Sequence, residues 1–142
     1  MRAFLVAIAL VASGALAGPS FAANQKDIAD CEQKTNDDLR IASCTRLINA
    51  RGLSPRDTAV VYTKRGIAWR NKEQDDKAMA DFNQAIRTDP KFGEALSNRG
   101  QMFLSAKQYD KAIADFTQAI KSDPKDSYAF RGRADAWDYK KE

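Results

Sequence analysis

The chain reads AVVYTKRGIAWRNKEQDDKAMADFNQAIRTDPKF at residues 59–92 and continues without a gap as GEALSNRGQMFLSAKQYDKAIADFTQAIKSDPKD at residues 93–126. Fifteen of the 34 aligned positions are identical. Most of them lie in the second half of each stretch, where KAMADFNQAI (77–86) matches KAIADFTQAI (111–120). Self-similarity at a fixed period is typical of repeat architectures, in which one supersecondary unit packs on the next.

Each stretch contains two apolar-periodic segments of about 14 residues with a polar turn between them. In the second segment Ala78, Phe82 and Ala85 recur at i, i+4 and i+7, which is the apolar stripe of an amphipathic helix. Gly66 is small enough to let a second helix approach closely. Pro90 ends the second helix, because the residue before proline is pushed out of the α region. The pattern therefore predicts antiparallel helix hairpins that must stack to bury their apolar faces.

This pattern resembles the tetratricopeptide (TPR) repeat, a helix–turn–helix unit with the same period. The signature positions of the first copy are Tyr62, Gly66, Trp69, Ala78, Phe82, Ala85 and Pro90, and those of the second are Leu96, Gly100, Phe103, Ala112, Phe116, Ala119 and Pro124. The family's usual leucine before the glycine is arginine in both copies. The resemblance implies an all-α solenoid of hairpins that forms a right-handed superhelix. The rings of Trp69, Phe82, Phe103 and Phe116 are expected inside it.

The repeat pattern extends beyond residues 59–92 and 93–126 in both directions. Upstream, residues 41–48 align with residues 79–86, which predicts a divergent helix hairpin with a long linker over residues 25–58. Its first helix is expected at residues 27–34. Downstream the pattern restarts, and residues 127–142 form either the first helix of a further repeat or a C-terminal capping helix. The sequence leaves these two interpretations open.

The two cysteines lie in the divergent hairpin. Cys31 and Cys44 are 13 positions apart, as are Trp69 and Phe82, and they flank the turn at Asp37-Asp38 symmetrically. One of these two aspartates is expected to cap the second helix. In an oxidising compartment the spacing predicts a Cys31–Cys44 disulfide. The alternatives are two buried free thiols or, less in keeping with the spacing, a redox-active pair.

The N-terminal residues have the order of a secretory signal peptide. A positive Met1-Arg2 precedes the uncharged run Phe4–Ala17, and small residues follow up to Ala22. A helix over this run spans about 21 Å, which is short for a bilayer core of about 30 Å. We therefore expect residues 1–22 to be removed and the mature chain to be periplasmic or secreted in a bacterium. The alternative is an uncleaved anchor.

Composition excludes several classes of function. The chain has no histidine, which removes histidine-based acid–base catalysis and most zinc or haem sites. It contains no glycine-rich phosphate loop and no cluster of metal-ligating residues. A net charge of +4 over 142 residues is too weak and dispersed to indicate nucleic-acid binding. We expect no catalytic residue, no cofactor, no metal site and no enzyme activity.

Charged residues also recur with the period of the repeat. Arg65, Arg99 and Arg133 are each 34 positions apart, and so are Asp81 and Asp115. A basic ladder of this kind is consistent with a phosphate or anion track. The other interpretation, which we favour because acid and base repeat together, is that each arginine pairs with an aspartate of a packed neighbour and fixes the stacking angle.

The family resemblance implies that the first helix of each repeat lines a concave groove. The corresponding residues are Thr63, Ile67, Arg70, Asn71, Ser97, Gln101, Leu104, Ser105, Arg131, Asp135 and Asp138. This mixed surface suits an extended peptide or a partner helix. Some family members hold a chaperone C-terminal carboxylate with lysine and asparagine, but Thr63 and Ile67 occupy those places in the first regular copy.

We therefore predict a non-catalytic scaffold or adaptor that binds another protein. The alternatives are a structural protein that self-associates through its exposed repeat ends and a subunit appended to an enzyme complex. The identity of the partner and the oligomeric state do not follow from the sequence.

Overall fold

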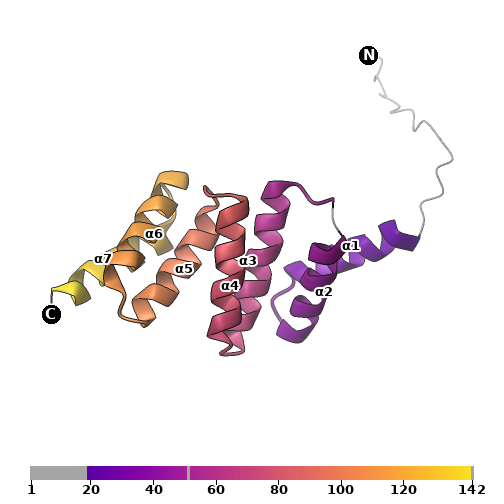
Figure 1. Cartoon of the computed structure of the whole chain (residues 1–142), viewed down its shortest axis with the longest axis horizontal. Coiled ribbons are helices and arrows are strands. Elements are labelled where there is room, and N and C mark those ends of the chain that lie inside the picture. Colours follow the sequence, from indigo (N-terminus) through magenta and orange to yellow (C-terminus); the bar gives the residue numbers. More distant parts are fainter. Residues whose placement is uncertain (1–18, 51, 142) are drawn as a thin grey trace, which may run out of the picture.

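The computed structural model describes residues 19–50 and 52–141. These residues form a row of α-helices and include no strand (Figure 1). The helices are α1 (Pro19–Glu32), α2 (Asp37–Ala50), α3 (Pro55–Asn71), α4 (Asp75–Thr88), α5 (Gly93–Ser105), α6 (Tyr109–Ser122) and α7 (Ser127–Lys140). The expected all-α solenoid of hairpins is confirmed. The greater part of the expected signal peptide, residues 1–18, lies outside the described residues.

Helix contacts give the array its curvature. Each even-numbered helix packs against the odd-numbered helices on either side of it, and α1, α3, α5 and α7 also contact one another in succession. The described parts of α2, α4 and α6 make no such contacts with each other. The odd-numbered helices are therefore closer together and lie on the inner side of the bend. We call the surface formed by α1, α3, α5 and α7 the concave face.

The divergent hairpin is formed by α1 and α2. Its first helix begins at Pro19, eight residues before the expected start, and ends at Glu32, two residues before the expected end. The prediction that an aspartate caps α2 is wrong. The cap is Asn36, the residue before Asp37, whose Oδ1 accepts a hydrogen bond from the Leu39 N–H over 2.9 Å. The two aspartates instead occupy the first turn of α2. Their negative charges there interact favourably with the positive end of the helix dipole.

A disulfide between Cys31 and Cys44 joins the two helices of this hairpin, as the sequence predicts. Both cysteines are buried, and they pack with Leu47 and Val61 in one apolar cluster. The disulfide thus stands where the regular hairpins have an aromatic pair. Closing a loop of about 14 residues stabilises the folded state by about 3 kcal/mol in the chain-entropy model.

Aromatic rings and glycines hold the regular hairpins together. Phe82 and Phe116 are fully buried, and a methyl group at Gly66 would lie 2.7 Å from the Phe82 ring. A methyl group at Gly100 or Gly132 would likewise meet the Phe116 ring, at 3.1 and 2.4 Å. Glycine is therefore needed for the close approach of α3 to α4 and of both α5 and α7 to α6.

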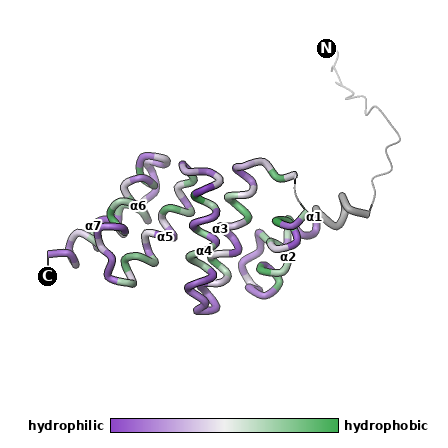
Figure 2. The backbone as a smooth tube through the Cα atoms, in the orientation of Figure 1, coloured by the Kyte–Doolittle hydropathy of each residue, from purple (hydrophilic) through white to green (hydrophobic). Residues whose placement is uncertain are grey.

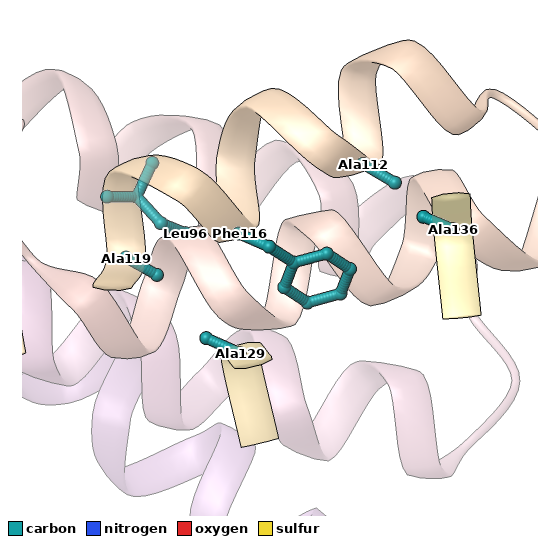
Figure 3. Packing of buried hydrophobic residues seen from close by; sticks show 6 residues of the cluster. All are labelled: Leu96, Ala112, Phe116, Ala119, Ala129 and Ala136. Atoms are coloured by element: carbon teal, nitrogen blue, oxygen red, sulfur yellow. The ribbon is translucent and has the colours of Figure 1, made fainter. Parts of the chain in front are cut away.

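Figure 3 shows the Phe116 ring among Leu96, Ala112, Ala119, Ala129 and Ala136. The other two aromatic residues of the expected set, Trp69 and Phe103, are partly buried against the neighbouring core clusters. The expected inward placement of the four rings is confirmed. Hydrophobic and hydrophilic residues alternate along helices such as α2 and α5 (Figure 2).

Candidate functional site

Three depressions with mixed polar and apolar linings lie along α3 and α5. The first, of about 280 Å³, lies where the end of the α1–α2 hairpin meets α3, and it is lined by Lys34, Arg40, Lys64, Ile67, Asn71 and Glu94. The second, of about 350 Å³, lies between α3, the start of α4 and α5, and it is lined by Arg70, Asp75, Asp76, Met79, Gln101, Met102, Ser105 and Ala106. The third, of about 400 Å³, lies between α5 and α7 and includes Arg56, Glu94, Ser97, Asn98, Asp126 and Tyr128. We call them the α1–α3, α3–α5 and α5–α7 depressions.

An apolar cavity of about 280 Å³ adjoins the α1–α3 depression. Its lining includes Ile28, Leu47, Leu53 and Val60. Lys64 lines both hollows, and Glu32 and Asp57 also line the apolar cavity. A ligand that fills it can therefore place an apolar side chain beside charged groups of both signs.

Six of the eleven residues expected to line the groove lie in the three depressions. Ile67 and Asn71 line the first, Ser97 lines the third, and Arg70, Gln101 and Ser105 line the second. The structure brings these residues together along α3 and α5. The three expected residues of α7 are exposed, and they are Arg131, Asp135 and Asp138.

Thr63, Ser97 and Leu104 differ from the expectation of an accessible groove side chain. Thr63 is fully buried, and its hydroxyl donates to the Ala59 carbonyl over 2.8 Å. Ser97 is also buried and donates to Asp126 Oδ2 over 2.8 Å. Leu104 packs against the core around Phe116. These side chains stabilise the wall of the groove, and Thr63 presents nothing to a ligand.

Hydrogen bonds between successive odd-numbered helices order the concave face. Arg70 Nη1 donates to Asn98 Oδ1 over 2.9 Å, which links α3 to α5. The Tyr128 hydroxyl donates to Gln101 Oε1 over 3.4 Å, which links α5 to α7. Such side-chain bonds position the groups that line the depressions before any ligand arrives.

The sequence did not single out Lys64, Glu94, Asn98 and Tyr128 as residues of this face. Lys64 and Asn98 are 34 positions apart, and so are Glu94 and Tyr128. The residues of each pair therefore occupy equivalent positions of successive repeats on the concave face. Because the paired residues differ in type, identity between the copies does not reveal them.

The charge of the concave face changes along the array. The α1–α3 depression contains three basic side chains, Lys34, Arg40 and Lys64, against the single acid Glu94, which lies 3.8 Å from Lys64. The α5–α7 depression instead includes three acidic side chains and two basic ones, namely Glu94, Asp123, Asp126, Arg56 and Lys91. A bound segment would therefore meet positive charge near α1 and negative charge near α7.

The recurring arginines hold the stacked helices together. Arg65 binds both carboxylate oxygens of Asp81, over 2.8 and 2.7 Å, and its Nη1 reaches Thr45 of the preceding hairpin. Hydrogen bonding to Asp81 raises the pKa of Arg65, so the guanidinium stays charged. Arg99 repeats the arrangement with Asp115 and with Asn83. Pairing with an aspartate is thus confirmed for both arginines, and their donors are occupied rather than free for an anion.

Two further properties of the described residues bear on function. No three histidine, cysteine or carboxylate side chains among residues 19–50 and 52–141 are grouped so that they could hold a metal ion. In the same part of the chain, every helix is too short or too polar to cross a bilayer.

Several solved structures are similar to this fold. The first TPR of Spaghetti (RPAP3), bound to the HSP90 peptide SRMEEVD, superposes with a TM-score of 0.72 at 19% identity over 87% of this chain and 94% of that one. The first TPR domain of human RPAP3 gives 0.70 at 19% identity, over 86% and 92%. The Arabidopsis OM64 TPR domain gives 0.70 at 23% identity, over 84% and 95%. At these identities the likeness concerns the fold.

The family models agree with the boundaries of the internal repeat. Residues 59–92 and residues 93–126 each match the tetratricopeptide repeat. No curated protein matches the chain. The two family matches, the helix hairpins and the superposed structures lead to one conclusion: this chain is a tetratricopeptide-repeat protein.

Proposed function

We propose that this protein is a non-catalytic interaction module that binds an extended peptide segment along its concave face. The observation that carries the proposal is the row of three depressions along α3 and α5, whose polar side chains are already ordered by hydrogen bonds between helices. Hydrogen-bonding groups in a preformed groove suit an extended chain with unpaired backbone groups. Peptide-bound relatives of the same fold support it, including the Spaghetti domain with its HSP90 peptide and the yeast Sti1 TPR2B domain in complex with an Hsp70 peptide.

The lining of the face suggests the chemistry of the ligand. At the α1 end, the apolar cavity lies beside the basic α1–α3 depression, with Lys64 at both. A segment with an apolar side chain would fill the cavity, and a polar group beside it would meet Lys64, Glu32 and Asp57. Because Thr63 is buried and Ile67 is apolar, the two places named for the chaperone-tail clamp offer no polar side chain to a ligand. We therefore propose an internal peptide segment as the ligand rather than a chaperone C-terminus.

The experiment compares proteins crosslinked to wild type and to variants in the cell-envelope fraction. The groove variant combines Arg70→Glu with Gln101→Glu, which reverses one charge and adds another in the α3–α5 depression. The matched control combines Arg87→Glu with Gln108→Glu, which changes the same residue types at exposed positions of α4 and of the turn before α6. We expect the groove variant to lose the specific partners and the control to keep them. An identical captured set for wild type and the groove variant would refute the proposed site.

We also propose that the protein works outside the cytoplasm, in the periplasm or secreted. The sequence of residues 1–22 supports export, and the Cys31–Cys44 disulfide is a bond that persists in oxidising compartments. Removal of these residues would shorten α1 from its N-terminal end and leave Ala23–Glu32 to pair with α2.

Intact-mass measurement of the protein recovered from the envelope fraction tests both features. We expect a chain that begins at Ala23 and takes up no alkylating agent until a reductant is added. The same chain expressed in the cytoplasm without residues 2–22 is the control, and it should be alkylated at both cysteines. Two alkylated cysteines in the unreduced envelope protein would exclude the disulfide, and a mass that includes residues 1–22 would exclude cleavage.

A further inference from the structure

The last helix of the array has a side that no described residue covers. The buried side of α7, formed by Ala129, Gly132 and Ala136, packs against α6. A second stripe of the same helix contains Phe130, Arg133 and Trp137, at i, i+3 and i+7. Phe130 is 43% exposed and Trp137 is 47% exposed. We call the surface formed by Phe130, Arg133 and Trp137 the α7 end face. Helix α7 itself lies at the far end of the row of helices (Figure 1).

The equivalent stripe of α5 is covered. Its residues Leu96, Arg99 and Phe103 lie 34 positions before those of the α7 end face, and α6 packs over them. Leu96 is only 3% exposed there, against 43% for Phe130. In α3, Arg65 and Trp69 of the corresponding stripe likewise face α4. The α7 end face is therefore the side of a repeat that normally packs against a second helix.

The covering helices use the same chemistry each time. Lys77 of α4 lies 4.3 Å above the Trp69 ring, and Lys111 of α6 lies 5.4 Å above the Phe103 ring. Four residues further along each helix, an aspartate accepts two hydrogen bonds from the arginine of the stripe. A phenylalanine follows directly and fills the core. The covering sequence is thus Lys, then Asp at i+4, then Phe at i+5.

Arg133 is the charged residue of the α7 end face with which the aspartate of a covering helix would pair. No described carboxylate lies within ion-pair distance of it, although Arg65 and Arg99 each bind one. Its guanidinium lies 5.4 Å above the exposed Phe130 ring, and Lys140 of the same helix lies 5.4 Å above Trp137. The face therefore combines a cation with two exposed rings, which is complementary to a carboxylate beside an aromatic side chain.

We propose that the α7 end face binds an amphipathic helix of a partner protein, which carries a carboxylate and an adjacent aromatic residue and covers α7 as α6 covers α5. This surface goes beyond the concave face and does not depend on it. Arg131, Asp135 and Asp138, which the family resemblance assigns to the groove, are not part of the stripe of Phe130, Arg133 and Trp137. The two proposals therefore fail separately.

A peptide with the sequence of residues 108–124, QYDKAIADFTQAIKSDP, is a suitable probe because it contains the covering pattern of α6. Fluorescence anisotropy of the labelled peptide measures its binding to the full chain. We expect Asp115→Asn in the peptide or Arg133→Ala in the protein to weaken binding at least about tenfold, since a charge-assisted hydrogen bond is lost. Arg131→Ala, an arginine of the same helix outside the stripe, should leave the affinity within about twofold, as expected of a side chain outside the contact.

Three further measurements make the result decisive. Arg133→Asp combined with a peptide that carries Asp115→Arg should restore binding, which a loss of folding would not allow. Binding that is insensitive to both Arg133→Ala and Trp137→Ala would show that the peptide binds at another place in the array, and it would overturn the proposal.

Sedimentation equilibrium tests whether a second copy of the chain, rather than a partner helix, covers the α7 end face. A dimer of the chain that Trp137→Ala dissociates would show that a second copy, not a partner helix, covers α7.

Discussion

Replacing Phe116 with alanine should lower the free energy of unfolding by about 3–5 kcal/mol, the range for removing a fully buried phenylalanine ring. Phe116 has no exposed surface, and its ring lies against Gly100 of α5 and Gly132 of α7. Truncation leaves a cavity between three helices, and Gly100 and Gly132 beside it have no side chains to fill it. Urea unfolding followed by circular dichroism measures the loss.

The matched control is Phe130→Ala, because this phenylalanine is 43% exposed on α7. It should change the free energy of unfolding by no more than about 0.5 kcal/mol, as is usual for surface substitutions. Hydrogen exchange adds spatial detail, and we expect the amides of α7 in Phe116→Ala to lose the most protection. A loss for Phe116→Ala no larger than that for Phe130→Ala would contradict the stacked core shown in Figure 3.

The sequence predicted those features of the fold that the repeat imposes more than once. Phe82 and Phe116, and Gly66 and Gly100, occupy the same places in two copies, so each copy supports the interpretation of the other. The disulfide was predictable for a related reason, because its two cysteines keep the separation of the aromatic pair. Where only one copy exists, the local details were missed: α1 begins earlier than expected, and Asn36 rather than an aspartate caps α2.

The groove was predicted less completely than the fold. Family resemblance gave the helix positions that face inward, but not how deeply neighbouring repeats bury them. Ser97 is buried, and Asp126, the residue that caps α7, accepts its hydrogen bond. The sequence does not mark Lys64 and Asn98 as residues of the concave face, because they are neither apolar nor identical to each other. Burial of a polar side chain depends on contacts between units, which the pattern within one unit does not contain.

Replacing Arg99 with alanine should cost about 3 kcal/mol of stability, because it leaves a buried carboxylate without its partner. The Asp115 side chain is 9% exposed and accepts two hydrogen bonds from Arg99, over 2.7 and 2.8 Å. The same guanidinium reaches Asn83 of the preceding hairpin, so the substitution also loosens the stacking of α4 on α5. Arg99→Lys keeps the charge but cannot span both partners, and we expect an intermediate loss.

The arginine series supplies its own control, since Arg133 occupies the same place in α7 with no described carboxylate in reach. Arg133→Ala should therefore change the stability by no more than about 0.5 kcal/mol. The double variant Arg99→Met with Asp115→Leu should regain most of the loss, because no buried charge remains, and a double-mutant cycle should give a coupling of at least about 1 kcal/mol. Equal effects of Arg99→Ala and Arg133→Ala would mean that the buried pair does not hold the repeats together. The stacking would then depend on the aromatic rings and glycines alone.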